Sequence, residues 1–186
     1  MLKKTVDQIL PGTAARFPNK AALIFDNRTC TYRELERLTN QAANGLKTLG
    51  VQKGGRVTLF AQNSAEWVFS YIGIAKAGGV INPVNAMLTA DELAYVVKDC
   101  GARVLITTSE RAKTALHLKK DGSLKEIVVL GGTPIEGTIS FDDLIAGRAD
   151  TIEAPGNAPE DLSTICYTPA RRNFRKARCS VTIALF

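Results

Sequence analysis

Short apolar runs alternate along this chain with longer segments in which apolar residues recur at helical spacing. The clearest case begins with Thr31-Tyr32-Arg33-Glu34, a Thr-x-x-Glu capping box. In such a box the two side chains pair with backbone N–H groups that the start of a helix leaves free. Leucine and alanine side chains then recur three to four residues apart as far as Leu49, and Gly50 supplies a stop. We therefore expect an amphipathic helix directly after Thr31.

The same patterns predict further elements on both sides of this helix. Thr89-Ala90-Asp91-Glu92 is a second capping box, and Ser64 can cap another helix. Helices are also expected over residues 109–118 and 141–146. Strands are expected over residues 21–25, 56–61, 80–83, 103–107, 126–130 and 163–168. Strands that alternate with helices indicate βαβ units, so the expected fold class is α/β, with a parallel sheet covered by helices.

The net charge of +6 arises at one end of the chain. Five of the 24 basic residues lie between positions 169 and 186, where no acidic residue occurs, so the remaining nineteen face 18 acidic residues. The basic part of that segment holds a single aromatic residue, Phe174, for stacking on bases. We therefore expect no nucleic-acid partner.

No targeting or membrane signal is evident. Residues 1–7 contain two lysines and no apolar stretch, so a secretory signal is not expected. The most apolar stretch, residues 67–84, is interrupted by Lys76 and is therefore not expected to span a bilayer. These features favour a cytoplasmic protein.

The cysteines and the single histidine do not predict a metal or disulfide site. Cys30, Cys100, Cys166 and Cys179 lie far apart without any Cys-x-x-Cys pair, which favours reduced thiols. Cys166 falls within an apolar strand pattern and is interpreted as a packing residue rather than a nucleophile. His117 has no partner motif and is expected at the surface or at a helix end.

Six short sequence stretches, taken in their order along the chain, give information beyond secondary structure. They are residues 31–35, 50–57, 62–67, 76–85, 88–93 and 161–168. In wording, order and spacing they resemble the N-terminal part of the AMP-forming acyl-CoA synthetase, or adenylate-forming, superfamily. The resemblance is to fatty-acid or aromatic-acid CoA ligases more than to peptide-synthetase modules. It implies an incomplete N-terminal subdomain over residues 1–168 and a separate basic tail over residues 169–186. Gly55 departs from the pattern, because the family usually has aspartate there.

The resemblance implies a two-step reaction that uses ATP, Mg²⁺ and CoA. A small-molecule carboxylate attacks the α-phosphate of ATP, and the CoA thiol then attacks the acyl carbon of the acyl-adenylate. Family members hold the phosphates with a Ser/Thr/Gly-rich loop directly after a strand that ends in Tyr-Thr. Thr168 is the one residue here that reaches this loop, so it is the one cofactor-binding residue carried over. No catalytic or metal-binding residue is assigned, and residues 76–85 are expected to form core and turn.

The sequence after Thr168 belongs to no loop of that kind. It continues Pro-Ala-Arg-Arg-Asn-Phe-Arg-Lys-Ala-Arg. If the arginines use CGN codons, shifting the frame by one base permits Ser-Gly-Thr-Thr-x-x-Pro-Lys-Gly, which is close to the usual family loop. We interpret the tail as the result of a frameshift. The chain is then expected to be a truncated ligase that is inactive and binds none of the three cofactors.

Two other interpretations follow from the residues. A sheet that ends at Thr168 presents an open edge, so the chain can be a non-catalytic interaction module that pairs by strand addition with another chain, such as an intact paralogue. Alternatively it is a non-functional pseudogene product, because apolar faces that normally pack on the absent remainder would be exposed and would promote aggregation.

Overall fold

The computed structural model describes residues 4–167 and 178–181, the latter through their backbone alone. Its helices are α1 (Val6–Arg16), α2 (Tyr32–Thr48), α3 (Ala65–Lys76), α4 (Ala90–Cys100), α5 (Ser109–Lys120) and α6 (Phe141–Ile145). Its strands are β1 (Ala21–Phe25), β2 (Arg28–Thr31), β3 (Arg56–Phe60), β4 (Val80–Pro83), β5 (Val104–Thr108), β6 (Glu126–Leu130), β7 (Ile139–Ser140), β8 (Thr164–Tyr167) and β9 (Arg178–Val181). Helices and strands alternate through most of this order, as the sequence predicts.

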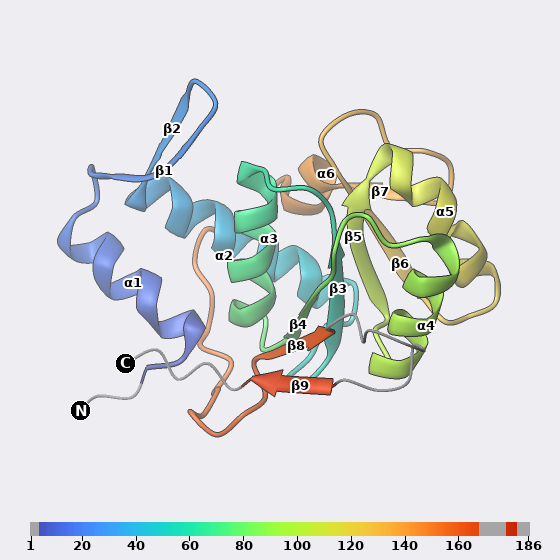
Figure 1. Ribbon diagram of the computed structural model, residues 1–186. Helices are drawn as coiled ribbons and strands as arrows, with labels where there is room; N and C mark the ends of the chain where they lie inside the picture. Colours follow the sequence, from blue (N-terminus) through green and yellow to red (C-terminus); the bar gives the residue numbers. More distant parts are fainter. Residues whose placement is uncertain (1–3, 168–177, 182–186) are drawn as a thin grey trace.

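Seven of the strands form one sheet in the order β7-β6-β5-β3-β4-β8-β9. The neighbours from β7 to β8 are all parallel, which confirms the predicted α/β fold. β1 and β2 pair with each other in a separate antiparallel hairpin, which projects from the body of the molecule (Figure 1). The strand predicted over residues 21–25 therefore exists, but it is not part of the parallel sheet.

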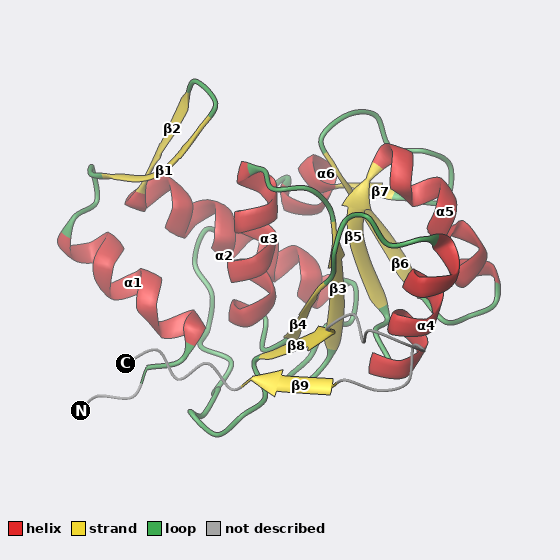
Figure 2. Cartoon of the chain, viewed as in Figure 1, coloured by secondary structure: helices red, strands yellow, loops and turns green. Residues whose placement is uncertain are grey.

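Side chains alternate between the two faces of the sheet. Val57 and Leu59 of β3 pack into a core with residues of α2 and α3, whereas Phe60 packs into a second core with residues of α4 and α5. Figure 2 shows α2 and α3 on one side of the sheet and α4 and α5 on the other. Both faces are thus covered by helices of the same chain, which is the arrangement that parallel sheets require.

This coverage differs from the expectation of exposed apolar faces. Among the described residues, the large hydrophobic side chains with substantial exposure are scattered singly: Phe17, Ile24, Met87 and Tyr95. Within the same part of the chain, no helix is both long enough and apolar enough to cross a membrane.

The predicted helix caps are present. Thr31 N–H donates to a Glu34 carboxylate oxygen over 2.8 Å, and Glu34 N–H donates to the Thr31 hydroxyl over 3.3 Å. The same reciprocal pair forms between Thr89 and Glu92, and the Ser64 hydroxyl accepts from Trp67 N–H over 3.0 Å. Each predicted cap therefore marks a real helix start.

β8 was expected to be the outermost strand of the sheet, with an open edge, but another strand covers it. β9 pairs with β8 in antiparallel fashion, from Thr164 opposite Val181 to Tyr167 opposite Arg178. The sequence analysis did not predict this strand. Its pairing with β8 uses backbone N–H and C=O groups, which every non-proline residue carries, so no particular side-chain pattern is required. Among the described strands, β9 and β7 are the two outermost of the sheet.

Candidate functional site

The carboxyl ends of the parallel strands meet at one edge of the sheet. These ends are Phe60, Pro83, Thr108, Leu130 and Tyr167. β3 leads into α3 on one face and its neighbour β5 leads into α5 on the other face, so the winding of the chain reverses between them. In open α/β sheets, ligands bind in the crevice outside such a reversal. This edge is the candidate site.

Polar groups fix the loops at this edge. The Thr107 hydroxyl donates to the Phe60 carbonyl over 2.6 Å and ties β5 to the end of β3. The Ser109 hydroxyl donates to the Thr133 carbonyl over 2.7 Å and ties together the loops that follow β5 and β6. The Arg111 guanidinium lies 5.2 Å from the centre of the Phe60 ring, within cation–π range. Hydrogen bonds therefore restrain the loops at this edge, and the Arg111 guanidinium lies beside them.

β8 reaches this edge held by side chains from both faces of the sheet. The Tyr71 hydroxyl of α3 and the Thr164 hydroxyl lie 3.3 Å apart. The Tyr167 hydroxyl donates to a carboxylate oxygen of Asp99, on α4, over 2.6 Å. Thr168, which the sequence predicted to bind cofactor, follows Tyr167 directly and lies outside the described residues.

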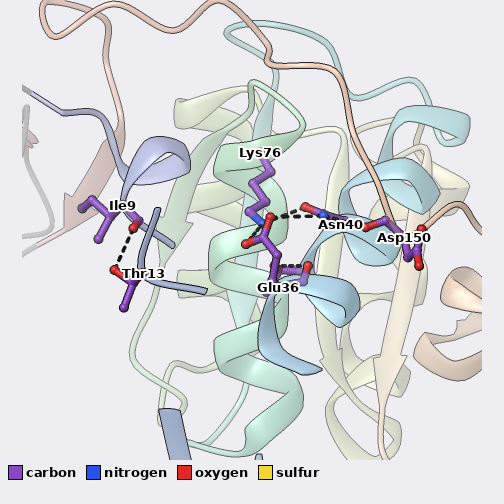
Figure 3. Close-up of polar contacts among 7 residues, drawn as sticks. Ile9, Thr13, Glu36, Asn40, Lys76 and Asp150 are labelled. Carbon is purple, nitrogen blue, oxygen red and sulfur yellow. Dashed lines mark hydrogen bonds and ion pairs between the residues drawn. The ribbon is translucent and has the colours of Figure 1, made fainter. Parts of the chain in front are cut away.

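A buried ion pair lies at the end of α3 away from this edge. Lys76 has a side-chain exposure of 2%, and its ammonium group lies 2.7 Å from a Glu36 carboxylate oxygen and 2.7 Å from the Asn40 side-chain carbonyl (Figure 3). The Asn40 amide group in turn donates to the Asp150 backbone carbonyl over 2.7 Å. The cluster therefore joins α3, α2 and the segment that follows α6.

Burial lowers the pKa of Lys76, and the hydrogen bond and charge of Glu36 oppose that shift. A lysine whose charge is met by a carboxylate at this distance remains an ammonium group and is not a free nucleophile. We assign the cluster to fold stability, which agrees with the expectation that residues 76–85 are core and turn. The signal for it was a lysine at the end of an otherwise largely apolar helix.

Three cavities lie away from the carboxyl ends of β4, β5, β6 and β8, and one of them reaches the start of α3, which follows β3. One of about 190 Å³ lies at the amino ends of β3 and β4, beside Lys53 and Gly79. A second of about 400 Å³ lies beneath the β1–β2 hairpin, and a third of about 460 Å³ lies beside Lys76. Their linings mix charges of both signs, so none of them favours a particular ligand.

The histidine lies where the sequence predicts it, and two of the cysteines have thiols whose surroundings the structure describes. Cys30 and Cys100 are free thiols, and burial raises the pKa of each. A raised pKa keeps a thiol protonated and unreactive. His117 is exposed in the last turn of α5. Among the described residues, no three His, Cys, Asp or Glu side chains gather to hold a metal ion.

Comparison with known proteins gives a consistent family. Residues 10–169 match the family model described as AMP-binding enzyme. The 3-hydroxybenzoate–CoA ligase of Aromatoleum sp. (strain CIB) is 30% identical over 172 residues, which cover 92% of this chain and 33% of that protein. The crotonobetaine/carnitine–CoA ligase of Salmonella agona (strain SL483) is 29% identical over 171 residues, covering 88% of this chain and 31% of that protein. The chain thus spans about a third of the length of the curated relatives that it matches.

Solved structures share the fold. The anthranilate CoA ligase AuaEII, in complex with anthranoyl-AMP, matches with a TM-score of 0.87 and 35% identity, covering 93% of this chain and 34% of that one. A benzoate CoA ligase from Burkholderia xenovorans LB400 matches with a TM-score of 0.77 at 23% identity, covering 87% and 32%. The second likeness bears on the fold alone.

Proposed function

Because the chain belongs to the AMP-binding enzyme family, we propose that it is the N-terminal part of an AMP-forming carboxylic acid–CoA ligase. The observation that carries this proposal is the position of β8. It is a strand of the parallel sheet, its carboxyl end reaches the edge where the winding reverses, and it ends in Tyr167 directly before Thr168. The family resemblance implies that a phosphate-binding loop starts at this point.

The reaction proposed for the intact ligase has two steps. A carboxylate oxygen bonds to the α-phosphorus of ATP and pyrophosphate leaves, which gives an acyl-adenylate. The CoA sulfur then bonds to the acyl carbon, the thiol proton is lost, and AMP leaves. Mg²⁺ offsets phosphate charge in such transfers. We favour aromatic acids over fatty acids as the substrate class, since relatives act on 3-hydroxybenzoate and anthranilate.

The residues that follow Thr168 lack the composition of a phosphate-binding loop. Loops that hold phosphates use glycines so that backbone N–H groups can approach the oxygens. No glycine occurs between Thr168 and Phe186. We therefore propose that the chain itself neither binds ATP productively nor forms an adenylate, because positioning and charge stabilisation supply most of this catalysis.

We further propose that the sequence after Thr168 arose by a frameshift in a ligase gene. Support comes from the family match, which runs to residue 169 and so ends beside Thr168. Restoring the frame should recover Ser-Gly-Thr-Thr and a continuing ligase sequence. Nucleotide sequence that lacks such an alternative frame would remove this explanation of the tail.

The activity test is ATP–pyrophosphate exchange. Purified 1–186 is assayed with 3-hydroxybenzoate, anthranilate, benzoate and octanoate, beside the protein made from the frame-restored gene. We expect no exchange from the 186-residue chain and exchange from the restored protein, strongest with an aromatic acid. Exchange by the 186-residue chain would overturn its proposed inactivity. A restored protein inert towards every acid would count against the ligase assignment.

An interaction module is the second candidate. β9 occupies the β8 edge in this structure, so a partner strand would have to take the place of β9 or pair with its outer side. The β8 edge accepts an added strand, here from the chain's own residues 178–181. In this alternative, an intact paralogue supplies or receives the strand. Light scattering of the purified chain with and without the restored ligase tests the idea. A defined heteromeric species supports it, and two independent monomers reject it.

A further inference from the structure

β4 carries a proline where the sheet requires a backbone donor. In a parallel ladder, alternate residues of a central strand face alternate neighbours. On the β8 side, Ile81 N–H donates to the Ser163 carbonyl over 2.9 Å. Two residues later the donor facing β8 should belong to Pro83, which has no N–H. The next carbonyl of β8 in that register is the carbonyl of Ile165.

The interruption affects the β8 side only. On the β3 side the ladder continues past the proline, since Val84 N–H donates to the Leu59 carbonyl over 3.1 Å. β3 and β4 accordingly register over four residue pairs, whereas β4 and β8 register over one, Ile81 opposite Thr164. A central strand with a proline is unusual for this reason. β8 therefore needs another attachment to the sheet.

The side chain of Asn82 provides this attachment. Its amide nitrogen donates to the Ile165 carbonyl over 2.8 Å, and the Asn82 side chain is completely buried. Its amide oxygen accepts from the Thr58 hydroxyl over 3.0 Å and from the Cys100 thiol over 3.6 Å. A carbonyl on one side and two donor groups on the other leave the amide one orientation that satisfies all of them.

We propose that Asn82 is a positioning residue that holds β8 in the sheet by supplying the N–H that Pro83 lacks. It thereby sets where the chain leaves β8 at Tyr167. That this point carries the phosphate loop of an intact ligase rests on the proposed function; the attachment of β8 does not. Without the Asn82 donor, the Ile165 carbonyl has no partner from β4, and Ile165 is 6% exposed. A buried carbonyl without a partner favours opening of the strand that bears it.

The test is hydrogen exchange of the 186-residue chain, without nucleotide, compared between a β8 peptide (162–167) and a β5 peptide (104–108). Asn82→Leu should speed exchange in the β8 peptide about tenfold relative to the β5 peptide, the factor produced by about 1.4 kcal/mol. Thr58→Val is the matched control. It disturbs the same buried network but leaves the Asn82–Ile165 bond, so the ratio of the two peptides should stay within about twofold.

The decisive variant restores the missing donor. In Asn82→Leu/Pro83→Ala, the backbone N–H of the new alanine can donate to the Ile165 carbonyl, so at least half of the lost β8 protection should return. A purely packing role for Asn82 predicts no such return, and exchange as fast as in Asn82→Leu overturns the proposal. Should Asn82→Leu fail to fold, recovery of folding in the double variant is measured instead of hydrogen exchange. A folded circular-dichroism spectrum in the double variant supports the proposal, and an unfolded one overturns it, provided Pro83→Ala alone folds.

These results are separable from the ligase assignment, because none of them involves ATP, CoA or a carboxylic acid. A negative result in the ATP–pyrophosphate exchange assay does not affect the interpretation of hydrogen exchange in the β8 peptide. Conversely, if hydrogen exchange in the β8 peptide is the same in Asn82→Leu as in the unmodified chain, the positioning role of Asn82 is excluded and the proposed function is unaffected.

Discussion

The ammonium group of Lys76 and the carboxylate of Glu36 lie 2.7 Å apart between α3 and α2, and the lysine side chain is 2% exposed. Asn40 completes the cluster through its contact with the same ammonium group. A buried charge of this kind is tolerated only while its partners remain, because removal of one partner leaves the other without compensation.

Lys76→Met should lower the free energy of unfolding by about 2 kcal/mol, less than the about 3–5 kcal/mol of fully buried pairs, because Glu36 is 22% exposed. Urea unfolding measures this. Lys113→Met, on the exposed face of α5, is the control and should change stability by less than about 0.5 kcal/mol. Replacing both partners in Lys76→Met/Glu36→Leu should recover part of the loss. Equal effects of Lys76→Met and Lys113→Met would contradict the role of the cluster.

Gly45→Ala should destabilise the protein, because α6 approaches α2 at this glycine. A Cβ there would lie 2.7 Å from Leu144 Cγ and still closer to the Leu144 backbone carbonyl oxygen. Overpacking against backbone costs about 1–3 kcal/mol. Gly12→Ala in α1 is the matched control. Its Cβ would meet nothing closer than 4.0 Å, so it should stabilise the helix by about 0.5–1 kcal/mol. Thermal melts of both variants test the predicted opposite signs.

Asp121 should make stability depend on pH in the acid range. Hydrogen bonds from Ser123, and then the contact with Lys98 at 2.9 Å, hold the pKa of this carboxyl well below its usual range. At pH values between the pKa of Asp121 in the folded protein and its pKa in the unfolded chain, the unfolded chain binds more protons. The contribution of Asp121 to the free energy of unfolding is therefore complete above about pH 4 and is lost as the pH falls towards the pKa of the folded protein. Asp121→Asn should therefore lower the urea midpoint at pH 7, and the gap to the unmodified protein should shrink below about pH 4. A gap of constant size down to pH 2 would contradict this assignment.

Asn44→Ala should loosen the segment that follows α6. The Asn44 amide donates to the carbonyls of Ala149 and Thr151, each over 2.9 Å. Trypsin cleavage after Arg148 should therefore become several-fold faster, since each such bond contributes about 0.5–1.5 kcal/mol. Lys47→Ala, on the exposed side of the same helix, is the control. Unchanged cleavage in Asn44→Ala would mean that other contacts hold the segment.

Local signals in the sequence predicted most elements of the fold. Capping boxes at Thr31 and Thr89 located two helices to the residue, because a cap is a contact between residues three positions apart. α1 was missed because Pro11 lies within it and its apolar periodicity is weak. β7 was missed because it has only two residues, and the place of β1 in a hairpin depended on its pairing with β2.

The candidate site was predictable in part. The sequence predicted that the strand ending at Tyr167 belongs to the parallel sheet, and the order of the strands supports its place beside β4. It did not predict the Asn82–Ile165 bond, whose partners are 83 positions apart. Pro83 was the available signal, since a proline in a central strand implies that some other group satisfies the opposite carbonyl.

The sequence by itself determined where most of the helices and strands lie, that the fold is α/β, and the family to which the chain belongs. These depend on side-chain pattern, capping and short motifs, which act over a few residues. Tertiary structure alone decided that β9 covers the edge of β8, that Lys76 is paired within the core, and that Asn82 replaces the donor missing at Pro83. Each of these joins distant residues by contacts that form only once the sheet and its helices have packed, because hydrogen bonds and ion pairs require distances that local sequence does not specify.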